Sequence, residues 1–310
     1  MRASRRVVLG GALAAGAASA VGWAGTATAQ AGAARGSANR FSLGYAPHEG
    51  SFASRGNRIE QIAYAADQGF TAWEDNEAAG RSVEEQTAMA GALQQRNMTM
   101  GVFVAGMPRW GEMRPLLGGN DDADRERFLA DVRAAVDVAK RLNAKWMTVV
   151  PGFLDRKLPV EIQTARVIET MRRAAEIMEP HGFVLVMEPL NTFTDHPGVF
   201  LQTVPQGFAV AKGVDSPAVK VLADLYHEQI QAGNLIATMD ACWDEIGYLQ
   251  FGDNPGRNEP GTGEINYHNV VRWLRARKFA GVIGMEHGNS VEGRAGEERL
   301  VAAYRAMDAA

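Results

Sequence analysis

The 310-residue sequence has little cysteine and no excess of basic residues, and each of these features argues against a class of protein. Its single cysteine, Cys242, rules out a disulfide framework within the chain and a cysteine-rich zinc site. It has no basic excess, since 32 Lys and Arg stand against 36 Asp and Glu, and this argues against a nucleic-acid-binding protein. With 22% charged and 46% hydrophobic residues, the composition is that of a globular protein and not of a disordered or collagen-like chain.

The N-terminus has the features of an export signal. Ser4–Leu9 reads S-R-R-V-V-L, an apolar Ala/Gly-rich run follows, and Ala27–Ala29 fits the small-x-small rule for signal peptidase. We therefore predict a twin-arginine signal peptide over residues 1–29 and a flexible leader over 30–40. The alternatives are an ordinary secretion signal and a membrane anchor, but the apolar run is too short and too weakly apolar to span a bilayer comfortably.

A twin-arginine signal implies a partner and a location. The export machinery moves folded proteins, often with a cofactor in place, so the mature protein is expected in the periplasm or outside the cell, without stable membrane insertion. Residues 1–29 carry three arginines and no acidic residue, so their removal takes the net charge from −4 to −7. We allow for a homo-oligomer, which the sequence does not decide.

Short β-type runs alternate with longer amphipathic stretches from Phe41 on, and the unit recurs eight times. The expected strands are Phe41–Tyr45, Thr71–Glu74, Thr99–Val104, Trp146–Val150, Val184–Glu188, Val219–Asp224, Ile246–Phe251 and Gly281–Glu286. The expected helices lie near 58–68, 83–96, 121–142, 160–179, 202–212, 228–240, 266–277 and 294–307. Eight parallel βα units in about 250 residues predict a closed (β/α)8 TIM barrel, one domain over 41–310. The alternative, an open doubly wound sheet, usually has a glycine-rich nucleotide loop after its first strand, and none follows here.

Glycine or asparagine stands near the end of several expected helices, at Gly69, Asn97, Asn143 and Gly182. These two residue types tolerate the left-handed backbone conformation that commonly ends a helix. We therefore predict left-handed conformations at these four positions.

Each of the last four expected strands ends in a polar oxygen ligand. These residues are Glu188, Asp224, Gln250 and Glu286, and all four follow apolar runs. Catalytic groups of a TIM barrel lie at the C-terminal ends of its strands, so these side chains are expected to converge. Three converging carboxylates repel one another unless a positive charge neutralises them. The sequence therefore predicts one divalent metal, and an oxygen-rich ligand set favours Mn²⁺ or Mg²⁺.

Each of these residues also has a plainer interpretation when taken alone. Glu188 is compatible with a salt-bridged surface group, and Asp224 with an N-cap of the next helix. Gln250 is compatible with a hydrogen-bonding loop residue, and Glu286 with an arginine pair. The joint pattern favours the metal, because four adjacent strands would otherwise have to repeat the coincidence.

Two further residues follow the expected ligands closely. His227 lies three residues after Asp224, where it fits a pocket or a water-exposed loop equally well. Arg257 lies in a Gly/Pro-rich loop after the seventh strand, where it can clamp a substrate carboxylate or hydroxyls bidentately. Its alternative role is a structural pair with Glu259 or Glu264.

Aromatic residues and one further histidine are weaker candidates. Trp110, in the loop after the third strand, and His48, after the first, are candidates for the substrate wall. Trp73, Trp146 and Cys242 are expected in the core or in the walls.

Three segments resemble the hydroxypyruvate isomerase family, a branch of the xylose-isomerase-like TIM barrels to which the ketose 3-epimerases are related. They are Met187–Asn191, the E-P-G-T-G-E-I-N-Y loop at Glu259–Tyr267, and Gly284–His287. The resemblance covers about residues 41–307. It does not extend to Pro47–Glu49 or Glu74–Asn76, and an export signal is unusual for an enzyme of cytoplasmic glyoxylate metabolism.

The resemblance implies a barrel with one divalent metal. The family's ligands carry over onto Glu188, Asp224, Gln250 and Glu286. In the related epimerases, a histidine three residues after the aspartate and an arginine shortly after the third ligand bind substrate, and His227 and Arg257 stand at those positions.

The expected function is that of a divalent-metal-dependent isomerase acting on a small hydroxy-carbonyl compound or sugar through an enediolate. The metal stabilises the developing negative charge, while Glu188 or Glu286 acts as the catalytic base. Isomerisation can use one glutamate, whereas epimerisation needs both, one on each face of the carbon. A ketose 3-epimerase, a related lyase and an exported, non-catalytic sugar-binding barrel are the alternatives.

Overall fold

The computed structural model describes residues 40–309, which belong to one compact unit. The predicted signal peptide at 1–29, and the leader at 30–40 apart from Arg40, lie outside the described residues. Among the described helices, none combines the length and the apolar character that a membrane crossing requires.

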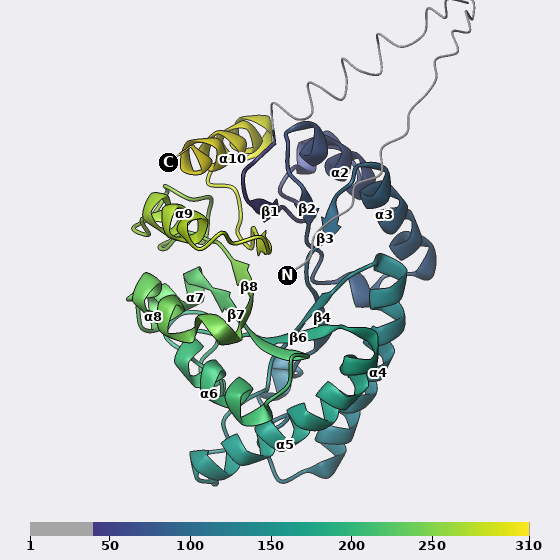
Figure 1. Cartoon of the computed structure of the whole chain (residues 1–310), viewed down its shortest axis with the longest axis vertical. Helices are drawn as coiled ribbons and strands as arrows, with labels where there is room; N and C mark the ends of the chain where they lie inside the picture. Colours follow the sequence, from purple (N-terminus) through teal and green to yellow (C-terminus); the bar gives the residue numbers. More distant parts are fainter. Residues whose placement is uncertain (1–39, 310) are drawn as a thin grey trace, which may run out of the picture. The chain divides into compact units, whose positions relative to one another are not determined.

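The strands form a ring of parallel strands with helices around its outside (Figure 1). The strands are β1 (Gly44–Ala46), β2 (Ala72–Trp73), β3 (Thr99–Met100), β4 (Phe103–Gly106), β5 (Trp146–Val149), β6 (Val184–Met187), β7 (Val219–Asp224), β8 (Ile246–Gln250) and β9 (Val282–Gly284). Seven of them form one sheet in the order β1-β9-β8-β7-β6-β5-β4, and β2 pairs with β3. Backbone hydrogen bonds close the ring on both sides of β2, from Glu74 N to Pro47 O (2.9 Å) and from Val104 N to Asn76 O (3.1 Å). The predicted (β/α)8 barrel is confirmed.

The third expected strand, Thr99–Val104, is in fact two strands. β3 pairs with β2, and β4 pairs with β5, with a break at Gly101–Val102. At Gly101 a Cβ atom would lie 2.4 Å from the Tyr248 hydroxyl oxygen, so the break lies where a side chain inside the barrel approaches the backbone closely.

The helices alternate with the strands nearly as predicted. The α-helices are α2 (Arg58–Asp67), α3 (Val83–Gln95), α4 (Asp122–Leu142), α5 (Val160–Met178), α6 (Val204–Val214), α7 (Leu225–Gln231), α8 (Leu235–Cys242), α9 (Tyr267–Ala276) and α10 (Gly293–Asp308). The 3₁₀ helices are η1 (Ala53–Arg55), η2 (Ala78–Gly80), η3 (Trp110–Glu112), η4 (Glu179–His181) and η5 (Trp243–Glu245).

The expected helix over 228–240 is wrong as a single element. It is two helices, α7 and α8, because Gly233 and Asn234 adopt positive φ values of 65° and 53° and interrupt the helix. The four predicted left-handed positions are confirmed, with φ values of 91° at Gly69, 53° at Asn97, 52° at Asn143 and 69° at Gly182.

Two hydrophobic clusters lie on the two faces of the strands. The larger one packs the strands against the helices, and the smaller one consists of Ala46, Ala72, Val102, Val186, Leu222, Tyr248 and Val282. Side chains alternate between the faces of a strand, so the small cluster fills the barrel interior. Residues two positions further along share this inner face, and they include Glu74, Glu188, Asp224 and Gln250. The alternation therefore directs several polar side chains into the barrel mouth, the end where the strands terminate.

Candidate active site at the barrel mouth

Glu188, Asp224 and His227 form a cluster in which one possible ligand atom of each residue lies within 4.8 Å of the others. Glu188 follows β6 and is 8% exposed, Asp224 ends β7 and is 2% exposed, and His227 lies in the first turn of α7. Asp224 also caps α7, because its Oδ1 accepts a hydrogen bond from Tyr226 N (2.8 Å). The capping interpretation of Asp224 is thus confirmed, and it leaves Oδ2 directed to the cluster, 3.6 Å from His227 Nε2.

His227 is not the water-exposed loop residue that one interpretation allowed, since it is buried. Its Nδ1 lies 2.7 Å from Asn191 Nδ2. The Asn191 Oδ1 already accepts from two backbone N–H groups, so the nitrogen end of this amide faces the ring. His227 Nδ1 is therefore the acceptor, and the neutral ring carries its proton on Nε2. Burial lowers the pKa of His227, which favours this neutral form.

Arg257 connects two of the predicted ligands. Its Nη2 donates to Asp224 Oδ2 (3.2 Å) and to Glu286 Oε2 (2.9 Å), and its guanidinium lies 4.7 Å from the centre of the Tyr226 ring. The pairs with Glu259 or Glu264 that the sequence allowed are not its contacts in the structure. The only cationic side chain that binds Asp224 among the described residues is thus shared with a second carboxylate.

Asp253 holds the loop that carries Arg257, and sequence analysis did not single it out. Its Oδ2 accepts from Gly261 N (2.8 Å) and Gly263 N (2.9 Å), and its carbonyl accepts from Arg257 N (2.9 Å). A Cβ atom at Gly263 would lie 2.2 Å from Asn254 O, which explains why glycine stands there. Much of the E-P-G-T-G-E-I-N-Y loop is therefore wrapped around one buried carboxylate.

Burial and crowding disfavour full ionisation of the site. Burial, and then the nearby Glu286 and Asp224, raise the pKa of Glu188 well above its ordinary value. Burial raises the pKa of Asp224 to about 7, against the opposing effect of Arg257. One guanidinium does not neutralise three carboxylates, so full ionisation would leave the mouth with a net negative charge.

Gln250 and Asp224 are register partners on neighbouring strands, which confirms that they stand at the same level. Within the described part of the chain, Gln250 Oε1 is buried and has no hydrogen-bond partner, while Nε2 donates to Glu74 Oε1 (2.7 Å). An acceptor without a donor beside carboxylates fits a divalent cation, and every predicted ligand is an oxygen, as Mn²⁺ and Mg²⁺ prefer.

The side of the mouth formed by β1 and β2 carries residues that sequence analysis missed. Glu74 is 1% exposed and accepts from Tyr248 Oη (2.9 Å) as well as from Gln250. Asn76 Nδ2 donates to Glu286 Oε1 (3.0 Å). A signal was present, since Glu74 follows an apolar run as Glu188 does, but it belongs to a strand outside the series of four.

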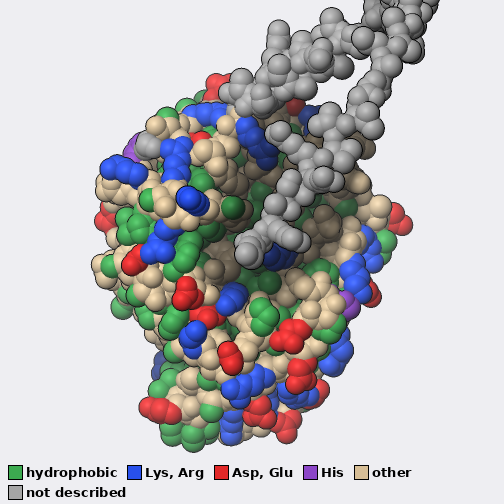
Figure 2. All heavy atoms as spheres, viewed as in Figure 1, with side chains coloured by type: hydrophobic (Ala, Val, Ile, Leu, Met, Phe, Trp, Pro, Cys, Tyr) green, Lys and Arg blue, Asp and Glu red, His purple; other side chains and the backbone are tan. Residues whose placement is uncertain are grey.

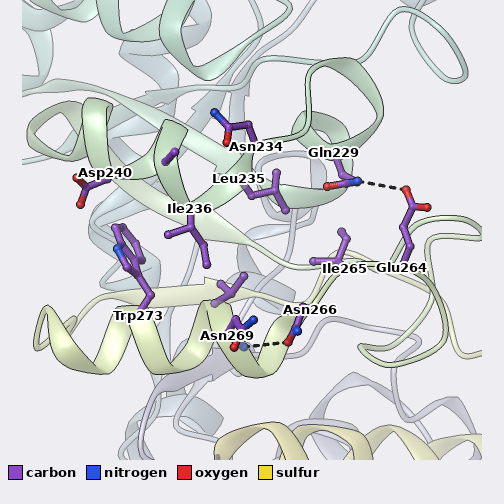
Figure 3. Close-up of a pocket in the computed structure, with 12 residues that line it drawn as sticks. Gln229, Asn234, Leu235, Ile236, Asp240, Glu264, Ile265, Asn266, Asn269 and Trp273 are labelled. Atoms are coloured by element: carbon purple, nitrogen blue, oxygen red, sulfur yellow. Dashed lines mark hydrogen bonds between the residues drawn. The ribbon is translucent and has the colours of Figure 1, made fainter.

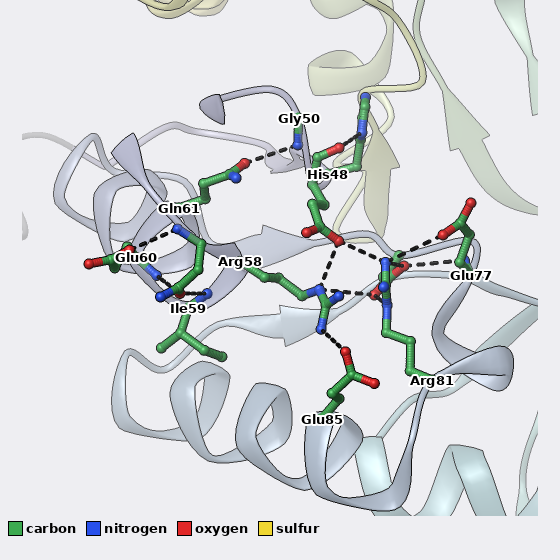
Figure 4. Close-up of polar contacts among 12 residues, drawn as sticks. His48, Gly50, Arg58, Ile59, Glu60, Gln61, Glu77, Arg81 and Glu85 are labelled. Atoms are coloured by element: carbon green, nitrogen blue, oxygen red, sulfur yellow. Dashed lines mark hydrogen bonds and ion pairs between the residues drawn. The ribbon is translucent and has the colours of Figure 1, made fainter. Parts of the chain in front are cut away.

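A network of ion pairs holds the loops after β1 and β2 together (Figure 4). Arg81 Nε lies 2.6 Å from the buried Asp75, and Arg81 Nη2 lies 2.8 Å from Glu49. Arg58 Nε lies 2.9 Å from Glu49 and 3.8 Å from Asp75. The two loops carry His48 and Glu74, so the network fixes this side of the mouth.

Cavities flank the site on two sides. One of about 400 Å³ is lined by polar side chains, among them His48, Asn76 and Glu286. Another of about 320 Å³ is lined by Trp110, Phe153 and other residues. Trp110 packs edge-on against Phe153, as expected of a wall residue, whereas Trp73 and Cys242 are buried.

A larger groove of about 660 Å³ lies elsewhere, between α8 and α9 (Figure 3). Leu235, Ile236 and Trp273 line it together with polar side chains, and none of the predicted site residues does so. On the face seen in Figure 2, acidic and basic side chains are interspersed over the outer helices.

Known proteins resemble the chain in sequence and in structure. It is 35% identical to the hydroxypyruvate isomerase of Escherichia coli (strain K12) over 162 residues, which are 52% of this chain and 62% of that protein. This alignment therefore spans just under two thirds of that relative. The 2-oxo-tetronate isomerase of Pectobacterium atrosepticum is 28% identical over 233 residues, 74% of this chain and 86% of that protein.

The fold is also that of solved structures. The crystal structure of a protein from Brucella melitensis described as an AP endonuclease of family 2 matches with a TM-score of 0.71 at 26% identity, and the match covers 81% of this chain and 95% of that one. Residues 62–309 match the family described as xylose isomerase-like TIM barrel. This range contains the predicted ligands and every strand after the first, and the chain therefore belongs to the xylose isomerase-like TIM barrel family.

Proposed function

We propose that the protein is a divalent-metal-dependent isomerase of the hydroxypyruvate isomerase kind, acting on a small hydroxy-carbonyl compound or sugar. Relatives named as isomerases support the reaction class. The observation that supports the metal dependence is the buried cluster of Glu188, Asp224 and His227. Gln250 is the register partner of Asp224, and among the described residues its buried Oε1 is an acceptor without a partner.

In this proposal Glu188, Asp224, Gln250 and Glu286 hold one Mn²⁺ or Mg²⁺. When bound, the ion supplies positive charge that stabilises the negative charge developing on the substrate oxygens. The neutral His227 is set aside as a ligand, because the proton on Nε2 makes that nitrogen a donor and not a metal-binding lone pair.

The side chains then divide the proton transfer between them. Glu188 and Glu286 come from β6 and from the end of β9, so they reach a substrate carbon from different sides of the mouth. Glu286 is held in place by Asn76 and Arg257, which leaves it oriented to take a proton from the carbon beside the carbonyl. Glu188, on the other side, would return a proton to the neighbouring carbon of the enediolate while the hydroxyl proton passes to the former carbonyl oxygen. Proton exchange with solvent would then restore the starting protonation states of both glutamates.

His227 and Arg257 bind the substrate oxygens in this scheme. His227 Nε2 lies 3.6 Å from Asp224 Oδ2, and a substrate hydroxyl or carbonyl oxygen bound beside Asp224 can accept its N–H. Arg257 offers charge-assisted donors at the opposite edge, suited to a carboxylate or a pair of hydroxyls.

The test combines metal analysis with proton exchange. Purified mature protein is expected to contain or bind one equivalent of Mn²⁺ or Mg²⁺ and to incorporate solvent deuterium beside the carbonyl of hydroxypyruvate or a small ketose. Chelation is expected to stop the exchange, and added metal to restore it. A protein that binds no stoichiometric metal and exchanges no proton would be a non-catalytic barrel. Inversion at the exchanging carbon without movement of the carbonyl would indicate an epimerase.

We also propose that residues 1–29 export the folded protein through the twin-arginine machinery, supported by the Arg5-Arg6 pair and the Ala27–Ala29 cleavage site. Replacing both arginines with lysine is expected to leave the uncleaved precursor inside the cell. Unchanged export of that variant would mean that the segment is an ordinary secretion signal.

A further inference from the structure

Glu74 is a buried carboxylate that the proposed chemistry does not use. It follows β2 on the inner face of the barrel, and both its oxygens accept hydrogen bonds from side chains of β8. Tyr248 Oη donates to Oε2 at 2.9 Å, and Gln250 Nε2 donates to Oε1 at 2.7 Å. Residues 248 and 250 are two positions apart on one strand, so a single carboxylate spans their spacing on the inner face.

The backbone around Glu74 leaves room for this arrangement. A Cβ atom at Gly284 would lie 1.9 Å from Glu74 Oε2, and a Cβ atom at Gly101 would lie 2.4 Å from Tyr248 Oη. Gly284 on β9 and Gly101 in the break between β3 and β4 thus leave space for the contact between Glu74 and Tyr248.

The consequence for Gln250 follows from the two ends of its amide. A side-chain amide has a donor end and an acceptor end, so one strong acceptor at the nitrogen fixes the direction of the oxygen. Without such an acceptor, the NH2 group would be drawn toward the carboxylates of the mouth, and Oε1 would turn away. With Glu74 behind it, Oε1 is buried and has no partner within the described part of the chain.

We propose that Glu74 is a positioning residue that orients the Gln250 amide so that its oxygen, and not its nitrogen, is presented to a divalent cation at the barrel mouth. Glu74 does not itself touch the cation or the substrate. The proposal rests on the proposed function only in requiring a cation at this mouth.

Reciprocal exchange of the two side chains gives the sharpest test. Gln250→Glu places two carboxylates face to face, and Glu74→Gln replaces a group that can only accept by an amide that can turn either its donor or its acceptor end toward Gln250. The double variant Glu74→Gln/Gln250→Glu restores the hydrogen bond in reverse, since the amide nitrogen introduced on β2 can donate to the new carboxylate while the amide oxygen accepts from Tyr248. It conserves net charge and side-chain size, so it remains informative if Gln250→Glu alone fails to fold.

Mn²⁺ affinity, measured by calorimetric titration of the mature protein with the metal alone, is the readout. Each single variant is expected to bind about 10- to 100-fold more weakly than wild type, the usual effect of losing a partner that orients a metal ligand. The double variant is expected to bind at least as tightly as wild type. Tyr248→Phe, which keeps the bond between Glu74 and Gln250, is the matched control and is expected to change the affinity less than threefold.

Glu74→Asp separates orientation from charge. It keeps the negative charge but shortens the side chain by one methylene, so an orienting role predicts a loss of affinity and a purely electrostatic role predicts none. The proposal is overturned if the double variant binds as weakly as the single ones or if Glu74→Asp binds as wild type does. A wild-type protein without Mn²⁺ or Mg²⁺ binding would overturn the proposed function as well, whereas wild-type binding with failed rescue would overturn this inference alone.

Discussion

The two sides of the barrel mouth are built on different principles. On the side of β6 to β9, acidic and amide side chains stand at strand ends and point directly into the site. On the side of β1 and β2, Glu74 and Asn76 act on those side chains through hydrogen bonds, and Arg58 and Arg81 tie the loops together. The first side is expected to determine whether chemistry occurs, and the second how well the chemical groups are aligned.

Removing a carboxylate from the β6–β9 side is expected to have the largest effect. Glu188→Gln keeps the size of the side chain but removes a predicted ligand and proton donor, so the rate of proton exchange should fall about 10²- to 10⁴-fold. Metal affinity should fall with it, as measured by titration with Mn²⁺. A loss of only a few-fold would make Glu188 a supporting residue and weaken the contrast between the two sides.

Arg257→Lys is expected to have the second-largest effect on turnover. Lysine keeps the charge but cannot reproduce the fork that reaches Asp224 and Glu286, so turnover should fall about 10²-fold while metal content stays intact. Arg272→Lys, on the exposed side of α9, is the matched control. Loss of metal in Arg257→Lys would assign Arg257 to the support of the ligands, and normal turnover would leave it only a role in holding its loop.

The pH dependence of the metal-free protein tests the crowding of carboxylates. Asp224 has a pKa of about 7 in the folded protein against an ordinary value of 3.8. The folded state therefore holds this proton more tightly than the unfolded state does. Protonation of Asp224 adds its full contribution to the free energy of unfolding below pH 4, and this contribution is lost as the pH rises through 7. The contribution is on the order of 4 kcal/mol.

Asp224→Asn carries no titrating group at this position. The metal-free variant should therefore lose less stability than the metal-free wild type between pH 4 and 7, as measured by thermal unfolding. Equal losses in the two proteins would show that ionisation of Asp224 does not cause the loss of stability. Added Mn²⁺ should restore the wild-type stability near pH 7.

Substitutions in the ion-pair network of the loops after β1 and β2 are expected to have the smallest effect on turnover. Asp75→Asn leaves Arg81 without its buried partner and should lower the free energy of unfolding by about 3 kcal/mol, with a few-fold change in turnover. Asp67→Asn, which loses only an exposed pair with Arg96, should cost at most about 0.5 kcal/mol. Loss of turnover as large as that of Glu188→Gln would remove the distinction between the two sides.

The same contrast explains what the sequence could predict. The barrel follows from the alternation of strands and helices, and the four strand-end residues follow from their position after apolar runs. Gln250 is predicted as a ligand because its strand end matches those of its neighbours. These are local patterns, which a linear sequence contains.

The β1–β2 side depends on contacts between distant residues. The hydrogen bond from Gln250 to Glu74 spans 176 residues, and the one from Asn76 to Glu286 spans 210. No spacing pattern in the sequence predicts contacts between residues so far apart. The tautomer of His227 depends in the same way on the amide of Asn191, 36 residues away. The break at Gly101 also has a distant cause, the Tyr248 hydroxyl.

A crystal structure of the mature protein with Mn²⁺, with the ion located by its anomalous scattering, tests the central claim most directly. We expect one ion bound by Glu188, Asp224, Gln250 Oε1 and Glu286, with Gln250 Nε2 still bonded to Glu74 and Arg257 drawn away from the Asp224 oxygen that the ion takes. An ion held by His227 Nε2 in place of Gln250 would contradict the account, and so would the absence of an ion at the barrel mouth.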